Sequence, residues 1–159
     1  MELRRVPAAV VATAFAAALA LAAQAAASPS APACRITQGD AVGPFQGTGG
    51  AGPRRAKIGT GHVLTGRILR FPDCKPIRGA LVDLWQSGRS GYDRRGRASV
   101  VTDRQGRFRF EGPVPFSYGR QPHIHIRVFV GGYEELLTRY VVAPGRRSGR
   151  ITLVLDPLL

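Results

Sequence analysis

The chain of 159 residues is predicted to be all-β, an antiparallel β-sandwich core with an irregular N-terminal arm. Short runs of branched and aromatic residues recur from residue 61 onward, separated by turn residues, which is typical of sandwiches. No stretch has a helical periodicity of useful length, and no sequence repeat is evident. The expected strands cover 62–69, 79–86, 97–102, 106–110, 123–130, 136–142 and 149–156.

The chain divides into three parts by composition. Residues 1–27 resemble a secretory signal peptide, 28–60 are too rich in Gly, Pro and small residues for a compact element, and 61–159 hold the predicted strands. After cleavage about 130 residues would remain, enough for one domain with one core. We therefore expect an irregular arm over 28–60 that packs on a β-sandwich domain at 61–159.

The signal-peptide prediction depends on the order of its regions. Arg4 and Arg5 precede an Ala/Leu/Val run from Pro7 to Ala23, and small residues lead to a cleavage site after about Ala27. A membrane-anchoring helix is the alternative, but a run of about 17 apolar residues is at the lower limit for spanning a bilayer. The pattern predicts export to the periplasm or the extracellular space, without a stable membrane anchor.

The two cysteines also favour an oxidising compartment. Cys34 and Cys74 both lie after the predicted cleavage site, and we expect one disulfide between the arm and the turn before the 79–86 strand. A lipid anchor on Cys34 is the alternative, because the residues before it faintly resemble a lipoprotein cleavage box. The proline at position 32 and the distance from the apolar run argue against it.

The formal net charge of +13 comes almost entirely from Arg. These arginines are spread from Arg54 to Arg147, without a basic helix and without aromatic residues interleaved on a strand face. We therefore expect no nucleic-acid partner. A basic rim would instead draw anionic substrates toward the protein.

Two imidazoles alternate with aliphatic residues in the 123–130 strand. Because residues i and i+2 of a strand share a face, His123, His125 and Arg127 would point one way, and Ile124 and its aliphatic neighbours would point toward the core. A His-x-His pair alone is weak evidence, since it also suits copper or zinc sites. Tyr92 and Tyr118 lie upstream, and two phenols with two imidazoles favour ferric iron, because phenolate stabilises the trivalent ion.

An ordered set of motifs resembles the intradiol ring-cleaving dioxygenases. The matching segments span about residues 34 to 142 and are far more specific together than singly. They are Gly43–Phe45, Leu64–Ile68, Cys74–Gln86, Gly91–Tyr92, Thr102–Phe110, Tyr118, Arg120–His125 and Leu137–Tyr140. The family fold that this resemblance implies also has a β-sandwich core.

The resemblance implies a metal site and a reaction. It assigns Fe(3+) to Tyr92, Tyr118, His123 and His125, with Tyr118 as the tyrosine that leaves when a catechol-type substrate chelates the metal. Arg120, three residues before the first His, would stabilise developing negative charge. The substrates would be a catechol-type ring and O2, the product a muconate-type dicarboxylate containing both oxygen atoms, and no organic cofactor would be needed.

Several departures from the family pattern leave questions open. The loops that carry the two tyrosines are shorter than in well-known members, so the resemblance does not fix the aromatic substrate. Arg139 stands where the family often has Gln, and it either adds a second cation at the pocket edge or faces solvent. The helical linker that joins catechol 1,2-dioxygenase dimers has no counterpart, so oligomeric state is open and a homo-oligomer is compatible with the sequence.

Two alternatives come from other functional classes. A metal-free, exported β-sandwich binding module would share the strand and hairpin motifs, but it would leave Tyr92, Tyr118, His123 and His125 unexplained. The second alternative is a copper or zinc protein of the envelope that binds its metal through the His-x-His pair. In such a protein the tyrosines would not be ligands. A ferric-phenolate colour would exclude both.

Overall fold

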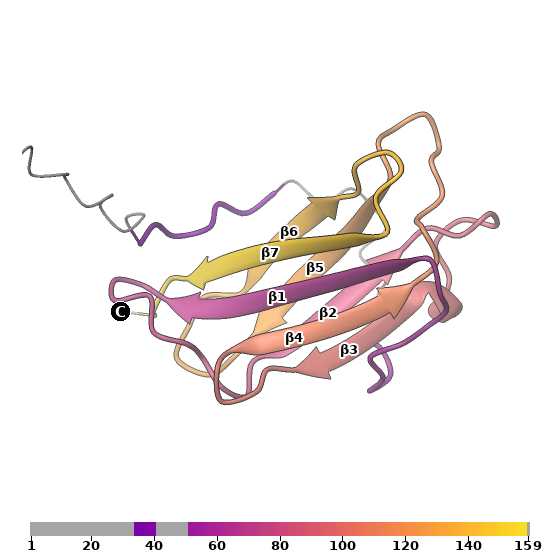
Figure 1. Cartoon of the computed structure of the whole chain (residues 1–159). Helices are drawn as coiled ribbons and strands as arrows, with labels where there is room; N and C mark the ends of the chain where they lie inside the picture. The colour runs from indigo at the N-terminus through magenta and orange to yellow at the C-terminus, as the bar shows by residue number, and fades with distance from the viewer. Residues whose placement is uncertain (1–33, 41–50, 159) are drawn as a thin grey trace, which may run out of the picture. The chain divides into compact units, whose positions relative to one another are not determined.

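The computed structural model describes residues 34–40 and 51–158, and the described part contains seven strands and one short 3-10 helix. Three strands form one sheet in the order β4-β1-β7, and four form the other in the order β3-β2-β5-β6. The two sheets lie face to face (Figure 1). The strands are β1 (His62–Arg70), β2 (Leu81–Gln86), β3 (Arg97–Val101), β4 (Arg107–Gly112), β5 (His123–Phe129), β6 (Leu136–Val141) and β7 (Ser148–Leu155), and the 3-10 helix is η1 (Arg94–Gly96).

The predicted β-sandwich is confirmed, and each predicted strand has a counterpart. One ladder departs from the antiparallel expectation, because β1 and β7 pair in parallel, with Val63 opposite Ser148 and Arg70 opposite Leu155. This pair joins the first and last strands, so the rest of the sandwich forms the connection that a parallel pair needs. Local sequence patterns carry no information about such a distant pairing.

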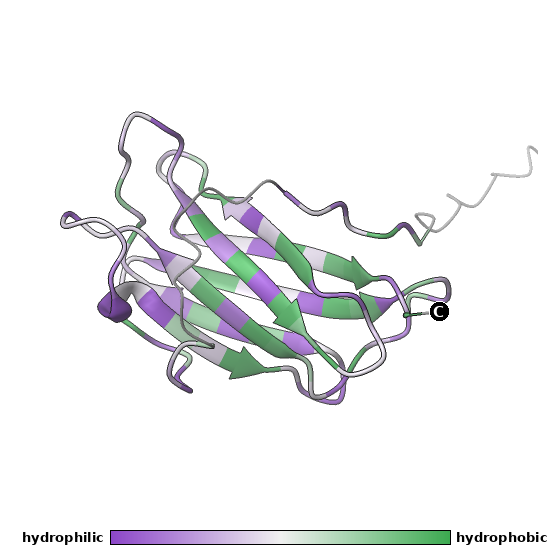
Figure 2. Cartoon of the chain, turned by 180° about the vertical axis from the view of Figure 1, so that it is seen from behind, coloured by the Kyte–Doolittle hydropathy of each residue, from purple (hydrophilic) through white to green (hydrophobic). Residues whose placement is uncertain are grey.

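Alternation along the strands builds the core between the sheets. In β5, Ile124, Ile126 and Val128 have no exposed surface and face the other sheet, as the period of two predicts. Figure 2 shows the same alternation of hydrophobic and hydrophilic residues along the strands. The histidines of β5 therefore lie on the outer face of the four-stranded sheet.

The turn predicted at Asp103–Gly106 connects β3 and β4, but these strands belong to different sheets, so it is a link between the sheets and the hairpin interpretation is wrong. Gly106 has a φ of 68°, and its amide donates to the carbonyl of Asp103 at 3.0 Å. The Asp103 carboxylate also accepts hydrogen bonds from the amides of Gln105 and Arg107, each at 2.8 Å. The Gly and Asp of this turn thus have the roles expected from the sequence.

Residues 34–40 and 51–58 cover the edges of both sheets. Thr37 exchanges hydrogen bonds with Val154 of β7, and the amide of Asp40 donates to Leu137 of β6. On the opposite edges, Arg55 and Ile58 donate to β3 and β4 through the carbonyls of Ser99 and Glu111. Each edge strand thus has an arm segment paired to it, which satisfies backbone groups that would otherwise be open to another chain.

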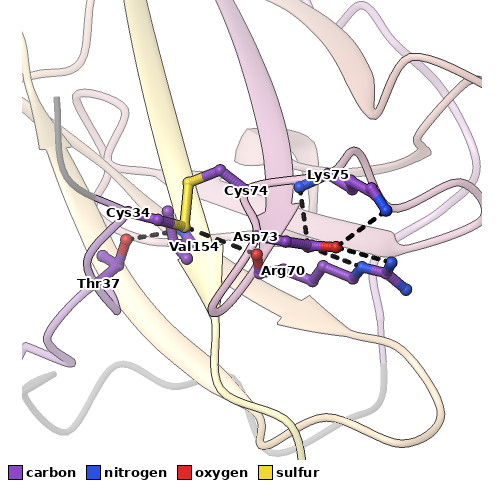
Figure 3. The surroundings of a disulfide bond; sticks show 7 residues. All are labelled: Cys34, Thr37, Arg70, Asp73, Cys74, Lys75 and Val154. Carbon is purple, nitrogen blue, oxygen red and sulfur yellow. Dashed lines mark hydrogen bonds and ion pairs between the residues drawn. A yellow bond between two sulfur atoms is a disulfide. The ribbon is translucent and has the colours of Figure 1, made fainter. Parts of the chain in front are cut away.

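The Cys34–Cys74 disulfide is present and ties the arm to the turn after β1 (Figure 3). Beside it, Asp73 accepts hydrogen bonds from the guanidinium of Arg70, and Thr37 holds Val154. The predicted signal peptide at 1–27 and the arm residues 28–33 and 41–50 lie outside the described residues. Within 34–40 and 51–158, no helix has the length and apolarity needed to cross a membrane.

Candidate metal centre

The sequence-predicted site lies at one end of the sandwich, on the outer face of the four-stranded sheet. β5 begins there with His123 and His125, and β2 ends beside it, because Trp85 pairs with His125 and Gln86 with Ile124. Tyr92 comes from the connection between β2 and η1. The side chains of the site thus come from the start of β5, the end of β2 and the connection between β2 and η1.

Three side chains of the predicted site converge on one point. The hydroxyl oxygen of Tyr92 lies 3.2 Å from Nε2 of His123 and 3.1 Å from Nε2 of His125. The two Nε2 atoms are 3.1 Å apart. The phenol oxygen and the two imidazole nitrogens therefore form a nearly equilateral triangle.

This triangle fits a metal ion. Ligand atoms about 2.1 Å from one ion, at right angles to each other, lie about 3.0 Å apart, close to the three observed separations. Within the described residues, no three His, Cys, Asp or Glu side chains gather in a way that could hold a metal. A metal at this point would therefore use the phenol as a ligand, and a phenolate is a hard anionic donor that suits a trivalent ion.

The two histidines are held in different ways. Nδ1 of His123 lies 2.8 Å from the carbonyl of Gln121, which can only accept, so Nδ1 carries a proton and Nε2 is turned toward the other two atoms of the triangle. His125 is 6% exposed. Its burial, followed by the neighbouring charges of His123 and Arg139, lowers its pKa to about 4. At neutral pH His125 can therefore bind a cation without first losing a proton to solvent.

Trp85 supports His125 from the neighbouring strand. The two rings stack with their centroids 5.0 Å apart and their planes 11° apart. Arg97 of β3 covers the indole, with its guanidinium carbon 5.6 Å from the ring centroid, and is paired with the buried Asp83 at 2.6 Å. Sequence reasoning missed this stack, because it depends on the register between β2 and β5.

The surroundings of Tyr92 shift the pKa of its phenol in opposite directions. Burial raises the pKa of its phenol, while a hydrogen bond with Ser87 and the charges of Arg120 and Arg139 act in the opposite direction. Burial prevails, so the pKa of the phenol lies above its ordinary value. The phenol would ionise only when a cation joins it, and the two arginines near it favour that anion.

Tyr118 does not join the triangle in this structure. Its hydroxyl donates to the carbonyls of Gly88 at 2.6 Å and Arg89 at 2.9 Å, and the side chain is 52% exposed. The segment carrying Tyr118 is fastened nearby, because Phe116 and Ser87 exchange two hydrogen bonds. Since a carbonyl accepts only from a protonated hydroxyl, this position holds Tyr118 as a neutral phenol.

Arg120 and Arg139, the two arginines that the sequence places near the site, lie at its edge. The Arg120 side chain is exposed, and its charge opposes the rise that burial causes in the pKa of Tyr92. Arg139 of β6 pairs across the strands with His125 and makes an ion pair with Asp40 of the arm at 2.6 Å. Asp40 was not expected at the site, because no local signal links an arm residue to a particular strand.

Comparison with known proteins gives the family. A family model described as "Dioxygenase" matches residues 42–144. No curated protein sequence matches the chain.

Solved structures share the fold. The dioxygenase domain of a dioxygenase carbohydrate-binding protein fusion from Streptomyces sp. SirexAA-E is 24% identical, with a TM-score of 0.66, covering 78% of this chain and all of that one. An intradiol ring-cleavage dioxygenase from Tetranychus urticae is 22% identical, with a TM-score of 0.66 and coverage of 79% and 97%. Hydroxyquinol 1,2-dioxygenase from Pseudomonas putida DLL-E4 is 18% identical, with a TM-score of 0.63 and coverage of 80% and 68%.

The family match covers the segment that carries Tyr92, Tyr118, Arg120, His123 and His125, and the fold match extends beyond it. The chain belongs to the intradiol ring-cleavage dioxygenase family.

Proposed function

We propose that this protein is an Fe(III)-dependent intradiol dioxygenase. It would cleave a catechol-type ring between its two hydroxylated carbons with O2 and release a muconate-type dicarboxylate. The observation that carries the proposal is the convergence of the Tyr92 oxygen and the Nε2 atoms of His123 and His125 within 3.2 Å of one another. A metal-free binding module has no use for that arrangement.

Tyr92, His123 and His125 would hold the ion, and Tyr118 would be the exchangeable fourth ligand. When bound, ferric iron supplies the Lewis acidity and the electron-accepting capacity that let a catechol ring react with O2. The hydrogen bond from His123 Nδ1 to Gln121 fixes the direction of the Nε2 lone pair. The stack of Trp85 on His125 fixes the plane of the second imidazole.

Tyr118 is suited to carry a proton. In its observed position the hydroxyl donates to the two carbonyls of Gly88 and Arg89, which stabilise the protonated form. After taking a proton from the substrate, the Tyr118 phenol would find its hydrogen-bond acceptors already in place. Tyr118 therefore serves as a general base that moves between two positions.

Arg120 and Arg139 supply positive charge at the same end. A catechol that binds as a dianion would bring negative charge into the site, and a guanidinium group offers a positive charge with several hydrogen-bond donors. Fixed positive charge beside the ring stabilises the charge that develops there during the reaction.

Oxygen uptake tests this function. Protein beginning at about Ser28, loaded with ferric iron, should consume O2 when catechol is added, and mass spectrometry with labelled O2 should find both oxygen atoms in a ring-opened dicarboxylate. Tyr92→Phe should abolish uptake, whereas Tyr133→Phe, a phenol outside the site, should leave it unchanged. An iron-loaded protein that consumes no O2 with catechol, hydroxyquinol or carboxylated catechols would contradict the proposal.

We also propose that the protein is exported. The disulfide between Cys34 and Cys74 supports this proposal, because such bonds persist in oxidising compartments. Fractionation of expressing cells, with mass analysis of the mature N-terminus, should find the chain cut near Ala27 outside the cytoplasm. An uncut chain that stays in the cytoplasm with reduced cysteines would contradict export.

A further inference from the structure

Arg139 lies beside the metal centre, where the proposed chemistry uses only its positive charge and leaves its hydrogen-bond donors without a role. On β6 it pairs directly across from His125, and His125 pairs on its other side with Trp85. The three side chains therefore form one row on the outer face of the sheet, since directly opposed residues of paired strands share a face. Arg139 is the end of that row, next to the ring of a metal ligand.

The charge of Arg139 is felt inside the site. Arg139 lies directly opposite His125 in the ladder between β5 and β6, and Nε2 of His125 is 3.1 Å from the Tyr92 oxygen. The guanidinium therefore belongs to a side chain beside the point where His125 and Tyr92 meet. A group bound at the metal would meet the same positive charge.

Asp40 of the arm holds this cation by an exchangeable contact. Its carboxylate oxygen lies 2.6 Å from Nε of Arg139, and its amide donates to the carbonyl of Leu137 at 2.9 Å. The Arg139 and Asp40 side chains are 40% and 31% exposed. An ion pair this open to solvent contributes only about 0–1 kcal/mol, so another carboxylate can displace it.

A substrate carboxylate would suit the guanidinium in the way that Asp40 does. Arg presents several donors in a plane, and paired N–H groups match the two oxygens of one carboxylate. Asp40 shows that a carboxylate reaches Arg139 at this edge of the site. Resting on the proposed function, we propose that Arg139 selects a catechol-type ring that carries a carboxylate, which replaces Asp40 on the guanidinium.

Two substitutions should have opposite effects. With ferric protein under anaerobic conditions, the dissociation constants of catechol and 3,4-dihydroxybenzoate are measured from the change in visible absorption on binding. Wild type should prefer the carboxylated ring, and Arg139→Gln should reduce that preference about tenfold by removing the charge-assisted contact. Asp40→Asn should instead tighten 3,4-dihydroxybenzoate about threefold and leave catechol unchanged, because it removes a competitor.

Matched controls keep charge changes apart from site effects. Arg150→Gln at an exposed position of β7 and Asp73→Asn in the Arg70 ion pair make the same charge changes away from the centre, and both should leave the preference at the wild-type value. If Arg139→Gln shifts the preference no more than Arg150→Gln, the selection role is wrong even though the dioxygenase function stands. If neither ring binds to the wild-type ferric protein, the proposed function itself fails.

A readout on metal-free protein is independent of iron loading. Titration with benzoate should move the Nε–Hε NMR signal of Arg139, and the movement should reach half-saturation at lower benzoate in Asp40→Asn. An Arg139 signal that stays fixed in both proteins, up to concentrations at which exposed arginine signals begin to move, would overturn the exchange of carboxylates.

Discussion

His125 should make the metal-free protein lose stability as the pH falls from neutral. Burial, with smaller contributions from His123 and Arg139, lowers its pKa from 6.5 to about 4 in the folded state. Between pH 6.5 and pH 4 the unfolded chain therefore binds a proton at this residue that the folded chain does not. Stability rises with pH wherever the unfolded state binds more protons than the folded state. The folded protein should therefore lose stability as the pH falls from 6.5 to 4.

The size of the effect follows from the gap between the two values. At about 1.4 kcal/mol per pH unit, the fall from 6.5 to about 4 corresponds to roughly 3 kcal/mol when the whole window is crossed. His62 contributes in the same direction, because burial lowers its pKa too. The free energy of unfolding should thus drop steeply from pH 7 to pH 4.

Urea unfolding of metal-free protein measures this loss. The experiment compares wild type with His125→Phe at pH 7 and at pH 4.5, so that carboxylates shared by both proteins cancel in the difference. We expect wild type to lose about 2 to 3 kcal/mol more than the variant over this interval, whatever the variant's stability at pH 7. Equal losses in the two proteins would refute the reasoning that His125 is buried and neutral.

Three further outcomes test other parts of the structure. Replacing both Cys34 and Cys74 by Ser removes the disulfide that closes a loop of 40 residues, and it should lower the free energy of unfolding by about 4 kcal/mol. A urea midpoint equal to that of wild type would contradict a stabilising disulfide. Trp85 is the single tryptophan, so its emission should be quenched when ferric iron, but not zinc, is titrated in; emission indifferent to iron would contradict the stack on His125. Asp83→Asn leaves two partly buried arginines without their carboxylate and should cost about 3 kcal/mol in urea unfolding; a loss below about 1 kcal/mol would show that the pair is dispensable.

The strands and the paired histidines were predictable because they depend on short-range rules. A period of two places His123 and His125 on one face and the aliphatic residues of β5 in the core, and the structure has them so. The turn at Asp103–Gly106 depends on the backbone freedom of one glycine and the side chain of one aspartate. Such features need no knowledge of the distant chain.

Features that depend on register or on distant segments were not predictable. The parallel pairing of β1 with β7 and the stacking of Trp85 on His125 are set by which strands meet and at which residue. Asp40 reaches Arg139 from the arm, which has no periodic pattern to read. The separation of Tyr118 from Tyr92 depends on hydrogen bonds in two loops whose lengths differ from those of well-known family members.

The central claim is that Tyr92, His123 and His125 hold ferric iron, and visible absorption with iron analysis tests it most directly. Wild-type protein loaded with ferric iron should retain about one iron per chain and show a red phenolate-to-iron band. Tyr118→Phe should keep a band from Tyr92, whereas Tyr92→Phe should lose that contribution and bind iron more weakly. A colourless wild-type protein whose iron washes away, or a band that is unchanged in Tyr92→Phe, would contradict the assignment.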